Sequence, residues 1–556
     1  MNATRETWRR MVLSARHPAH HIPVWEWLLD REHIYPARLD VPPWKRSRKS
    51  ERARPVTMAE LRCATFADSL YPKPVSIALT SLDDQVTIDV SASSDGAADI
   101  AEALLTPSQS GTYYVFADGG ANAFGPIMEW WLPTFVDLGY RVQPVASKIH
   151  MIMIRITKGR HSWYLIDWHS ISGMSMSELI TWHETNGTTS SELSNPLTLA
   201  LRHLTQVQEV LIARFGTALR PTVAGTAMAA MRWILPREVK VFRPHPTLVA
   251  LCRDGVGYRG GYMYARKYRG NAWAVDFRRL YLHCMTYPTA EHWSFSQYLP
   301  DDARNEGIYV CDVSGVPPIP VYLGVWNGTT DGFKREHWYG GETIAVIPTT
   351  EFAGLRAMGL TITPAFGYRI TRTFDVSEFV TTIADILSRI PSRSPLAAYI
   401  KIMGNGISGK WASNPVNRGI LYARERPPEA TFPALDERGN EIPDCWWYEQ
   451  TRYSGTQQIG LAAMITGLAR SRLYESLARI IAEGMEPIHV HTDGIIVKGS
   501  APLWATQLQD RIGELRYEGQ DTDAIVIAPG RYIFADKLKR SGASGGTRQT
   551  LVNQMG

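Results

Sequence analysis

The sequence predicts a mixed α/β protein of several domains, and three observations lead to this prediction. The chain has 556 residues, 44% of them apolar, whereas a single hydrophobic core rarely extends beyond roughly 250–300 residues. Stretches with strand-like alternation, such as "VTIDVSAS" and "MIMIRITKG", occur beside stretches with apolar residues at helical spacing, such as "PLTLALRHLTQVQEVLIARF". Polar and proline-rich segments separate these periodic stretches, as expected at domain boundaries.

The predicted elements follow one another in a definite order. An Arg- and Pro-rich leader precedes an α/β region, and a strand pair around "GYRGGYMYARKY" and a strand that ends in "AVDF" come next. A strand-rich insertion, a helical stretch and an irregular insertion follow, before a long helix, the hairpin "HVHTDGIIVKG" and a basic tail. The expected boundaries give the ranges 1–75, 76–225, 226–290, 291–376, 377–412, 413–455, 456–510 and 511–556.

Composition limits the class of protein. No run of about 18 apolar residues occurs, and the N-terminus lacks the apolar stretch of a signal peptide, so we expect a cytoplasmic protein. Five scattered cysteines without a CxxC pair favour reduced thiols over a disulfide framework or a structural zinc site. The net charge is only +5, but "WKRSRKSERARP" at 44–55 is strongly basic. This segment either follows phosphates or forms a solvated arm.

Two acidic residues stand at the ends of predicted strands. Asp493 lies at the tip of the hairpin over 489–499, and Asp276 ends a separate apolar strand. Carboxylates that converge from two strands suit phosphoryl transfer with two divalent ions about 3.5–4 Å apart. We therefore expect Asp276 and Asp493 to be catalytic and to hold the ions, with Phe277 as a further ligand. His491 projects to the same face as Asp493, so it lies near the ions or only hydrogen-bonds nearby.

Four segments together resemble a known family. "AVDFRRLYLHCM" (274–285), "YIKIMGNGISGKWASNP" (399–415) and "HVHTDGIIV" (489–497) resemble, in that order, the A, B and C motifs of family B DNA polymerases. The resemblance is strongest to the protein-primed group of bacteriophages and linear plasmids. "YRGG" (258–261) is similar to the segment that joins the exonuclease and polymerase modules in that group. Four such segments in the family's order argue against a chance match.

The resemblance implies a right-hand polymerase fold with palm, fingers and thumb, and with an N-terminal RNase H-like exonuclease-type domain. The implied division assigns 76–225 to the exonuclease-type domain, 226–290 and 456–510 to the palm, 377–412 to the fingers, and 511–556 to the thumb and basic tail. The insertion 291–376 would dock a priming protein, and the insertion 413–455 would encircle DNA.

The same resemblance implies the cofactors and partners. The cofactors are two divalent ions, Mg²⁺ or Mn²⁺. The partners are primer–template DNA, deoxynucleoside triphosphates and a terminal (priming) protein, and the polymerase would act as a monomer in the cytoplasm of a bacterial host or phage-infected cell. Priming by a protein, by nucleic acid or de novo stays open at this point.

Several residues are implied to bind the nucleotide. Tyr281 would exclude a 2′-hydroxyl beneath the incoming sugar, or it is an ordinary core tyrosine. Lys401, Asn405 and Ser408 stand at i, i+4 and i+7, so a helix would place them on one face. Two upstream arginines either supplement the phosphate site or belong to a solvated face: Arg389 and Arg393.

The residues implied to contact DNA come from four segments. They are Tyr258, Arg259, Gly260, Gly261, Gly409, Lys410, Thr492, Arg531 and Tyr532. Arg531 and Tyr532 resemble the Lys-x-Tyr segment that grips the primer end, although Gly530 stands where the lysine is expected.

The exonuclease-type region departs from the family pattern. Asp89 is kept, but Ser91 stands where the family has Glu, and Thr205 stands where it has Asp. Asp118 and Asn122 are interchanged in type. These changes predict a degenerate domain that does not edit.

The leading functional hypothesis is a DNA-directed DNA polymerase that uses two-metal phosphoryl transfer, is primed by a protein and lacks proofreading. His491, where the family has Asp, predicts a preference for Mn²⁺. The alternatives are an untemplated or self-priming nucleotidyltransferase and a catalytically decayed DNA-binding relative. Asp521 and Asp523 also spell the expected Asp-Thr-Asp, but too little chain follows them to complete the fold, so Asp493 is preferred.

Overall fold

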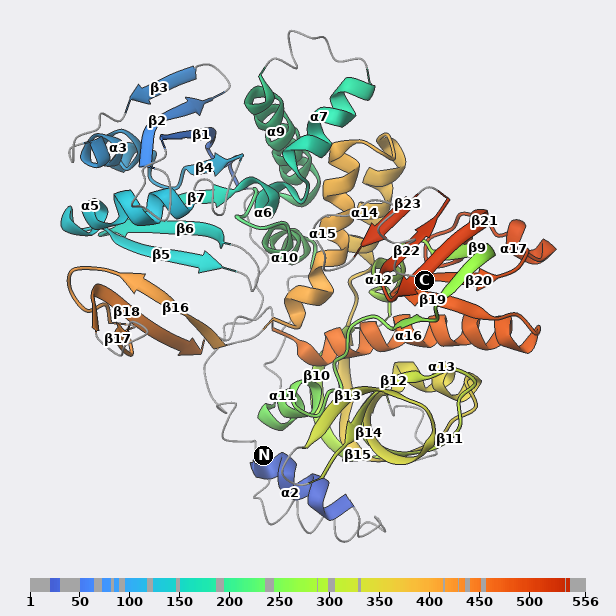
Figure 1. Ribbon diagram of the computed structural model, residues 1–556. Coiled ribbons are helices and arrows are strands. Elements are labelled where there is room, and N and C mark those ends of the chain that lie inside the picture. The colour runs from blue at the N-terminus through green and yellow to red at the C-terminus, as the bar shows by residue number, and fades with distance from the viewer. Residues whose placement is uncertain are drawn as a thin grey trace.

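The structure is a computed structural model, and three β-sheets organise the part of the chain that it describes (Figure 1). The described residues are 21–30, 51–64, 73–81, 85–89, 96–117, 124–146, 151–186, 195–235, 245–287, 289–298, 306–328, 332–413, 416–428, 430–435, 441–451, 457–535 and 537–540. No helix in these ranges is both long and apolar enough to cross a membrane.

A ten-stranded sheet forms the N-terminal domain, in the order β17-β18-β16-β5-β6-β7-β4-β1-β2-β3. Its central strands β1, β4 and β7 run parallel, and the other pairs are antiparallel. The strands are β1 (Val56–Ala64), β2 (Lys73–Thr80), β3 (Gln85–Asp89), β4 (Tyr113–Phe116), β5 (Arg141–Ala146), β6 (Met151–Lys158), β7 (His161–Asp167), β16 (Val416–Tyr422), β17 (Phe432–Leu435) and β18 (Glu441–Thr451).

This sheet corrects two of the expected boundaries. Strand β1 begins at Val56, so the N-terminal domain starts inside the predicted leader 1–75. Strand β16 pairs with β5 through Tyr422 and Val142. The described part of the insertion 413–455 therefore extends the N-terminal sheet, because backbone hydrogen bonding continues across that pairing.

Helices pack around this domain. Figure 1 shows α3 and α5 beside the sheet, and α9 and α10 between it and the rest of the molecule. Helix α9 begins after Asn195, whose side chain caps the Thr198 amide, and ends at Gly216 with φ 55°. The helices are α3 (Gly96–Leu104), α4 (Phe124–Pro126), α5 (Leu132–Asp137), α6 (Trp168–Ser172), α7 (Met176–Thr185), α9 (Pro196–Phe215) and α10 (Val223–Ile234), with the 3-10 helix η3 (Pro107–Gln109) and the π-helix η4 (Ile127–Trp131).

A six-stranded antiparallel sheet occupies the predicted strand-rich insertion, in the order β10-β15-β11-β14-β12-β13. The strands are β10 (Thr289–Gln297), β11 (Gly307–Gly315), β12 (Val321–Trp326), β13 (Phe333–Trp338), β14 (Gly341–Pro348) and β15 (Thr361–Phe374). The short helices η5 (Thr349–Glu351) and α13 (Phe352–Ala357) connect β14 to β15. Helix α2 (Ile22–Asp30) lies near this sheet in Figure 1.

A seven-stranded antiparallel sheet contains both predicted acidic strand ends, in the order β23-β22-β21-β9-β20-β19-β8. The strands are β8 (Met263–Ala265), β9 (Tyr268–Phe277), β19 (Pro487–His491), β20 (Gly494–Lys498), β21 (Leu515–Ala528), β22 (Arg531–Phe534) and β23 (Lys537–Arg540). Strand β21 pairs with β9 along most of its length. The described residues of 511–556 thus continue this sheet, and their assignment to the thumb and basic tail stays a prediction.

Helix α16 (Ile459–Ala482) lies between the seven-stranded and six-stranded sheets (Figure 1). The buried residues of its first half surround the helix axis, as expected for a segment covered on all sides, whereas the second half exposes one face. Helices α14 (Ser377–Arg389) and α15 (Pro395–Trp411) stand beside α10 and α12. The remaining helices are α11 (Pro246–Arg253), α12 (Leu280–Cys284) and α17 (Leu503–Thr506).

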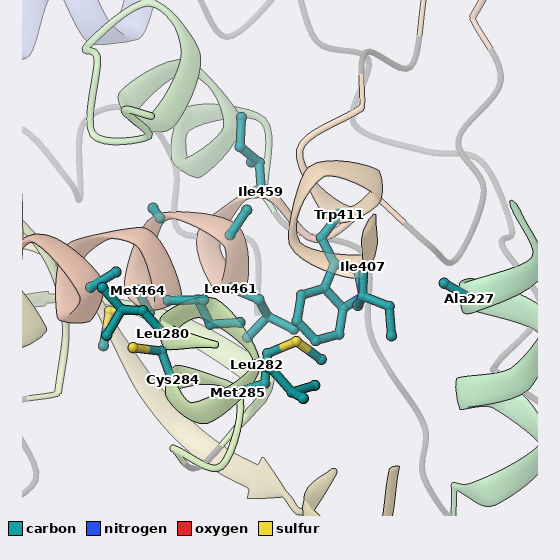
Figure 2. Packing of buried hydrophobic residues seen from close by; sticks show 14 of the residues in the cluster. Ala227, Leu280, Leu282, Cys284, Met285, Ile407, Trp411, Ile459, Leu461 and Met464 are labelled. Atoms are coloured by element: carbon teal, nitrogen blue, oxygen red, sulfur yellow. The ribbon is translucent and has the colours of Figure 1, made fainter. Parts of the chain in front are cut away.

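One apolar core fixes α15 to α12 and α16. Figure 2 shows Leu282 after β9, Trp411 and Ile407 on α15, and Leu461 on α16 in contact around a common centre. All four side chains are buried. Burying a side chain of this size contributes about 1.5–3 kcal/mol, so α15 is held firmly against α12, which directly follows β9, and against α16.

Four of the five cysteines are buried and outside any disulfide, as predicted for reduced thiols: Cys252, Cys284, Cys311 and Cys445. The side chain of Cys63 lies outside the description.

Candidate active site

Asp276 and Asp493 lie together at one end of the seven-stranded sheet. Asp276 on β9 pairs with Gly494 on β20, and the Phe277 amide donates to the Asp493 carbonyl oxygen at 2.8 Å. A Cβ added to Gly494 would lie 3.3 Å from the Asp276 Oδ1. Glycine at this position therefore leaves room for the carboxylate.

The turn between β19 and β20 is tightly held. Thr492 has φ 60°, a left-handed conformation that costs a β-branched residue roughly 1–2 kcal/mol. Its amide donates to the Tyr262 carbonyl oxygen at 2.8 Å, and its hydroxyl lies 2.7 Å from the Asp493 Oδ1. These contacts fix both the backbone and the carboxylate at the tip.

The first of two cavities beside the carboxylates, the basic cavity, is lined by four cationic and three acidic side chains. Its volume is about 360 Å³, and its lining includes both aspartates and two residues of α15, Lys401 and Asn405. Burial lowers the pKa of Lys401, and the nearby arginines lower it further. Its ammonium donates to the Ser392 carbonyl oxygen at 2.7 Å. The lining also includes Arg278, Arg279, Arg516 and Asp510.

Sequence reasoning missed the three arginines of this cavity. Arg278 and Arg279 follow Asp276 directly in "DFRRLY", so two consecutive cations after the strand end were an available signal. Arg516 had no local signal, because β21 reaches Asp276 only through sheet pairing. Its Nη2 lies 3.9 Å from the Asp276 Oδ2 and 2.6 Å from the Glu518 Oε1.

The second cavity also adjoins the carboxylates. It has a volume of about 370 Å³, and its lining includes both aspartates, His491, Glu518 and Tyr532. Burial raises the pKa of Tyr532, and the charges of Asp276 and Asp493 raise it further. Both aspartates line both cavities, so the carboxylates stand where the two cavities meet.

His491 lies beside the carboxylates and within a histidine pair. Its ring is parallel to that of His489, with the centroids 6.2 Å apart. His489 Nε2 accepts a hydrogen bond from the Gly530 amide at 3.1 Å. Gly530, which stands where the family has lysine, is thus hydrogen-bonded to His489 of this pair.

The oxygen ligands of the site suit divalent ions whose remaining ligands come from a substrate. Carboxylate and carbonyl oxygens of Asp276, Asp493 and Phe277 are the hard ligands that Mg²⁺ and Mn²⁺ accept. Within the described ranges, no three His, Cys, Asp or Glu side chains form a metal-holding group. Mg²⁺ commonly takes only one or two carboxylates and completes its coordination with substrate phosphates.

Other predicted nucleotide contacts lie away from the basic cavity. Ser408 is buried, and its hydroxyl donates to the Asn405 carbonyl oxygen at 3.2 Å, within α15. Arg389 forms an exposed ion pair with Asp385 at 2.8 Å. Arg393 lines a different cavity, beside α7. None of these three belongs to the lining of the cavity that contains Lys401.

Tyr281 packs beneath the hairpin turn. A Cβ added to Gly261 would lie 2.9 Å from the Tyr281 hydroxyl oxygen and 2.6 Å from the Thr492 Cγ2. Burial raises the pKa of Tyr281 to about 12. The described lining of the two cavities does not include this residue.

The predicted DNA contact by Arg259 is wrong for its side chain. Arg259 is 0% exposed and forms an ion pair with Glu351 at 2.5 Å, so its guanidinium cannot reach a ligand at the surface. Tyr258 is packed against the main core, whereas Gly260 is exposed. The pattern "YRGG" thus combines a buried arginine with an exposed Gly260 and a half-buried Gly261.

The other predicted DNA contacts are spread over separate places. Lys410 lines a cavity of about 660 Å³ between α10 and β6, and burial lowers its pKa. Gly409 is exposed on the same helix. Arg531 is next to Tyr532 on β22. Contact between these residues and DNA stays a prediction.

The exonuclease-type residues are only partly described. Thr205 lies on α9, and its hydroxyl donates to the Leu201 carbonyl oxygen at 2.9 Å. Ser91, Asp118, Asn122 and the side chain of Asp89 lie outside the described residues.

Comparison with known proteins shows the fold. No family model matches the sequence, and no curated protein matches it significantly. Phi29 DNA polymerase, solved with primer-template DNA and incoming nucleotide substrates, superimposes with a TM-score of 0.63 at 14% identity, covering 88% of this chain and 90% of that chain. Its orthorhombic crystal form gives a TM-score of 0.61 at 14% identity, over 90% and 94% of the two chains.

The same polymerase in complex with single-stranded DNA gives a TM-score of 0.60 at 14% identity, over 88% and 89% of the two chains. The predicted fold, a mixed α/β right hand with an exonuclease-type domain, is thereby confirmed. The resemblance to protein-primed family B polymerases is likewise confirmed at the level of the fold.

Proposed function

We propose that this protein extends a DNA strand by joining deoxynucleotides from their triphosphates to a 3′-hydroxyl. One observation carries the proposal: Asp276 and Asp493 stand where a basic cavity meets a second cavity that contains Tyr532. Nucleotidyl transfer needs an anion site and a site for the attacking oxygen on either side of the carboxylates. The polymerase fold is consistent with this arrangement.

The basic cavity suits the triphosphate of the incoming nucleotide. Burial lowers the pKa of Lys401, and the like charges of Arg279, Arg278 and Arg516 lower it further. A bound triphosphate would remove that repulsion, and the guanidinium groups can donate two hydrogen bonds each to phosphate oxygens. Lys401 on α15 and Arg516 on β21 would therefore hold the phosphates, with Asn405 beside the nucleotide.

The second cavity suits the end of the primer. Tyr532 would orient the terminal nucleotide with its hydroxyl. It lies close to Asp276 and Asp493, whose charges raise its pKa. Asp276, Asp493 and the Phe277 carbonyl would hold the divalent ions, which supply Lewis-acid activation of the attacking oxygen and neutralise phosphate charge.

We further propose that priming uses a protein hydroxyl and that the protein does not edit. The six-stranded sheet supports the first proposal, because it forms a lobe of its own between Asp276 and Lys401. Thr205 supports the second, since its hydroxyl is used within α9 and offers no carboxylate. A 3′-mismatched strand that stays intact with metal present would agree with the second proposal, and rapid degradation would contradict it.

Primer extension with and without a template tests the proposed function. Templated, sequence-dependent products support a DNA polymerase. Products of the same length without template would indicate an untemplated transferase. DNA binding without any extension would indicate a protein that only binds DNA.

A further inference from the structure

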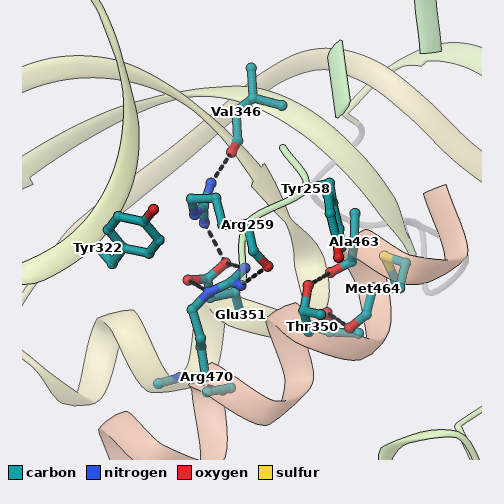
Figure 3. A network of polar contacts seen from close by, with 12 residues as sticks. Tyr258, Arg259, Tyr322, Val346, Thr350, Glu351, Ala463, Met464 and Arg470 are labelled. Atoms are coloured by element: carbon teal, nitrogen blue, oxygen red, sulfur yellow. Dashed lines mark hydrogen bonds and ion pairs between the residues drawn. The ribbon is translucent and has the colours of Figure 1, made fainter. Parts of the chain in front are cut away.

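A buried ionic cluster joins three segments that are distant in the sequence (Figure 3). Glu351 in η5 lies between the guanidinium groups of Arg259 and Arg470. Its carboxylate accepts from the Arg259 Nη2 at 2.5 Å and from the Arg470 Nε and Nη2 at 2.8 and 2.7 Å. The side chains are 0–1% exposed. The carboxylate thus holds together the insertion lobe, helix α16 and the segment before β8.

The cluster also binds the backbone around it. Arg470 Nη1 donates to the carbonyl oxygens of Arg259 and Gly260 at 2.8 and 2.9 Å. Arg259 Nη1 donates to the carbonyl oxygens of Val256 and Val346 at 3.0 and 2.9 Å. Carbonyl groups that accept from charged donors in a dry interior are strongly fixed. The path of the chain over residues 259–261 is therefore set by Arg470.

That segment in turn supports the catalytic hairpin. Gly261 lies against Thr492, since an added Cβ would come within 2.6 Å of the Thr492 Cγ2. The carbonyl oxygen of the next residue, Tyr262, accepts a hydrogen bond from the Thr492 amide at 2.8 Å. Thr492 lies next to Asp493 and contacts its carboxylate at 2.7 Å. A continuous series of contacts thus leads from Glu351 to Asp493.

We propose that Glu351 is a positioning residue, which acts through Arg470 and the segment 259–262 to hold Thr492 and, through it, the Asp493 carboxylate. Glu351 belongs to the connection between β14 and β15, so the insertion lobe contributes directly to the precision of the site. The expected effect on kcat rests on the proposed function. The expected effect on hydrogen exchange of the Thr492 amide rests on the hairpin contacts alone.

Glu351→Gln is the direct test, because it keeps the shape of the side chain and removes its charge. Glu486→Gln is the matched control: Glu486 precedes the same hairpin strand β19 but forms exposed ion pairs with Arg266 and Lys498. For each variant, hydrogen exchange of the Thr492 amide, kcat, KM for nucleotide and affinity for primer–template are measured, and circular dichroism checks folding.

We expect Glu351→Gln to speed exchange at Thr492 and to lower kcat by about tenfold to a hundredfold, the range for a displaced catalytic group. KM for nucleotide should change by no more than about threefold, because the variant leaves the cations of the basic cavity in place. Glu486→Gln should stay within about twofold of wild type throughout. A folded Glu351→Gln variant with unchanged exchange and kcat would overturn the proposal.

A triple variant separates positioning from folding. Arg259→Met, Glu351→Leu and Arg470→Met together replace the cluster with apolar side chains, a change that often preserves or raises stability. The carbonyl groups of Arg259 and Gly260 then lose their donors, so we expect a folded protein with fast Thr492 exchange and low kcat. Recovery of both quantities would show that Glu351 serves stability alone. If the wild-type protein extends no primer, the proposed function fails, and the exchange measurement still tests Glu351.

Discussion

Arg516 on β21 lies directly opposite Asp276 on β9, with its guanidinium 3.9 Å from that carboxylate. Arg516 also contacts Glu518 at 2.6 Å and lines the basic cavity. It therefore stands between the acid expected to hold a metal ion and the cavity expected to hold the phosphates. A cation at this place should disfavour the metal and favour the nucleotide.

Arg516→Gln should lower the Mg²⁺ concentration needed for half-maximal extension and raise KM for nucleotides. Both groups are partly exposed, so we expect about 0.5–1 kcal/mol, or about two- to fivefold in each quantity. The matched control is Arg269→Gln, which removes an exposed ion pair with Asp523 from the same pair of strands. Equal behaviour of the two variants would mean that Arg516 has no role in the site.

The lowered pKa of Lys401 predicts a pH dependence of nucleotide use. Burial and the nearby arginines lower this pKa from its ordinary value of 10.5, so the ammonium loses its proton at a lower pH than an exposed lysine. kcat/KM, which reports the free enzyme, should therefore decline as pH rises through that lowered pKa. Lys401→Arg should abolish the decline, because a guanidinium stays charged. A decline that persists in this variant would belong to another group.

Tyr281 should discriminate against ribonucleotides if its ring lies beneath the incoming sugar. Tyr281→Ala is then expected to raise ribonucleotide incorporation relative to deoxynucleotide incorporation by about tenfold or more, the discrimination of about 1–3 kcal/mol that one steric contact provides. Tyr281→Phe keeps the ring and should keep the selectivity. Unchanged selectivity in Tyr281→Ala would leave a core tyrosine that only supports the hairpin turn.

His491 should set the metal preference. Replacing it by Asp adds an anion beside Asp493, which should strengthen Mg²⁺ binding by about 1 kcal/mol in a solvent-screened site. The wild-type protein is expected to prefer Mn²⁺, which tolerates imidazole better. His491→Asp should shift the optimum toward Mg²⁺, and His491→Asn should not. The extension rate measured against the concentration of each metal tests this prediction. Identical profiles for wild type and His491→Asp would show that His491 has only a structural role.

Local pattern was enough to predict several elements and the acidic pair. The hairpin expected over 489–499 is formed by β19 and β20, because strand alternation and a polar tip are encoded in adjacent residues. The helical stretch expected over 377–412 contains α14 and α15, where apolar residues recur at helical spacing. Asp276 and Asp493 are neighbours because β9 and β20 pair.

Long-range pairing and burial could not be predicted from the sequence. The sequence around Arg259 suggests a cation at the surface. Its partners Glu351 and Arg470 are 92 and 211 residues away along the chain. Strand β21 reaches β9, and β16 reaches β5, through sheet pairings that no local pattern specifies. The same reason explains why Arg516 was missed and why Ser408 was expected in a cavity that it does not line.

The most direct test of the account is templated primer extension by Asp493→Asn and Asp276→Asn. Each variant keeps the shape of its side chain and removes one metal-binding charge. Asp523→Asn is the control, because Asp523 belongs to the alternative "DTD" sequence and pairs with Arg269. Primer–template affinity is measured alongside, to separate catalysis from binding.

We expect the wild-type protein to extend the primer and the two site variants to lose extension by about 10²–10³-fold or more, the range for one preorganised transition-state contact. Their DNA affinity should change by no more than about threefold, since neither residue neutralises a backbone phosphate, and Asp523→Asn should behave as wild type. Near-normal extension by either site variant, with the loss found in Asp523→Asn instead, would contradict the assignment of the active site.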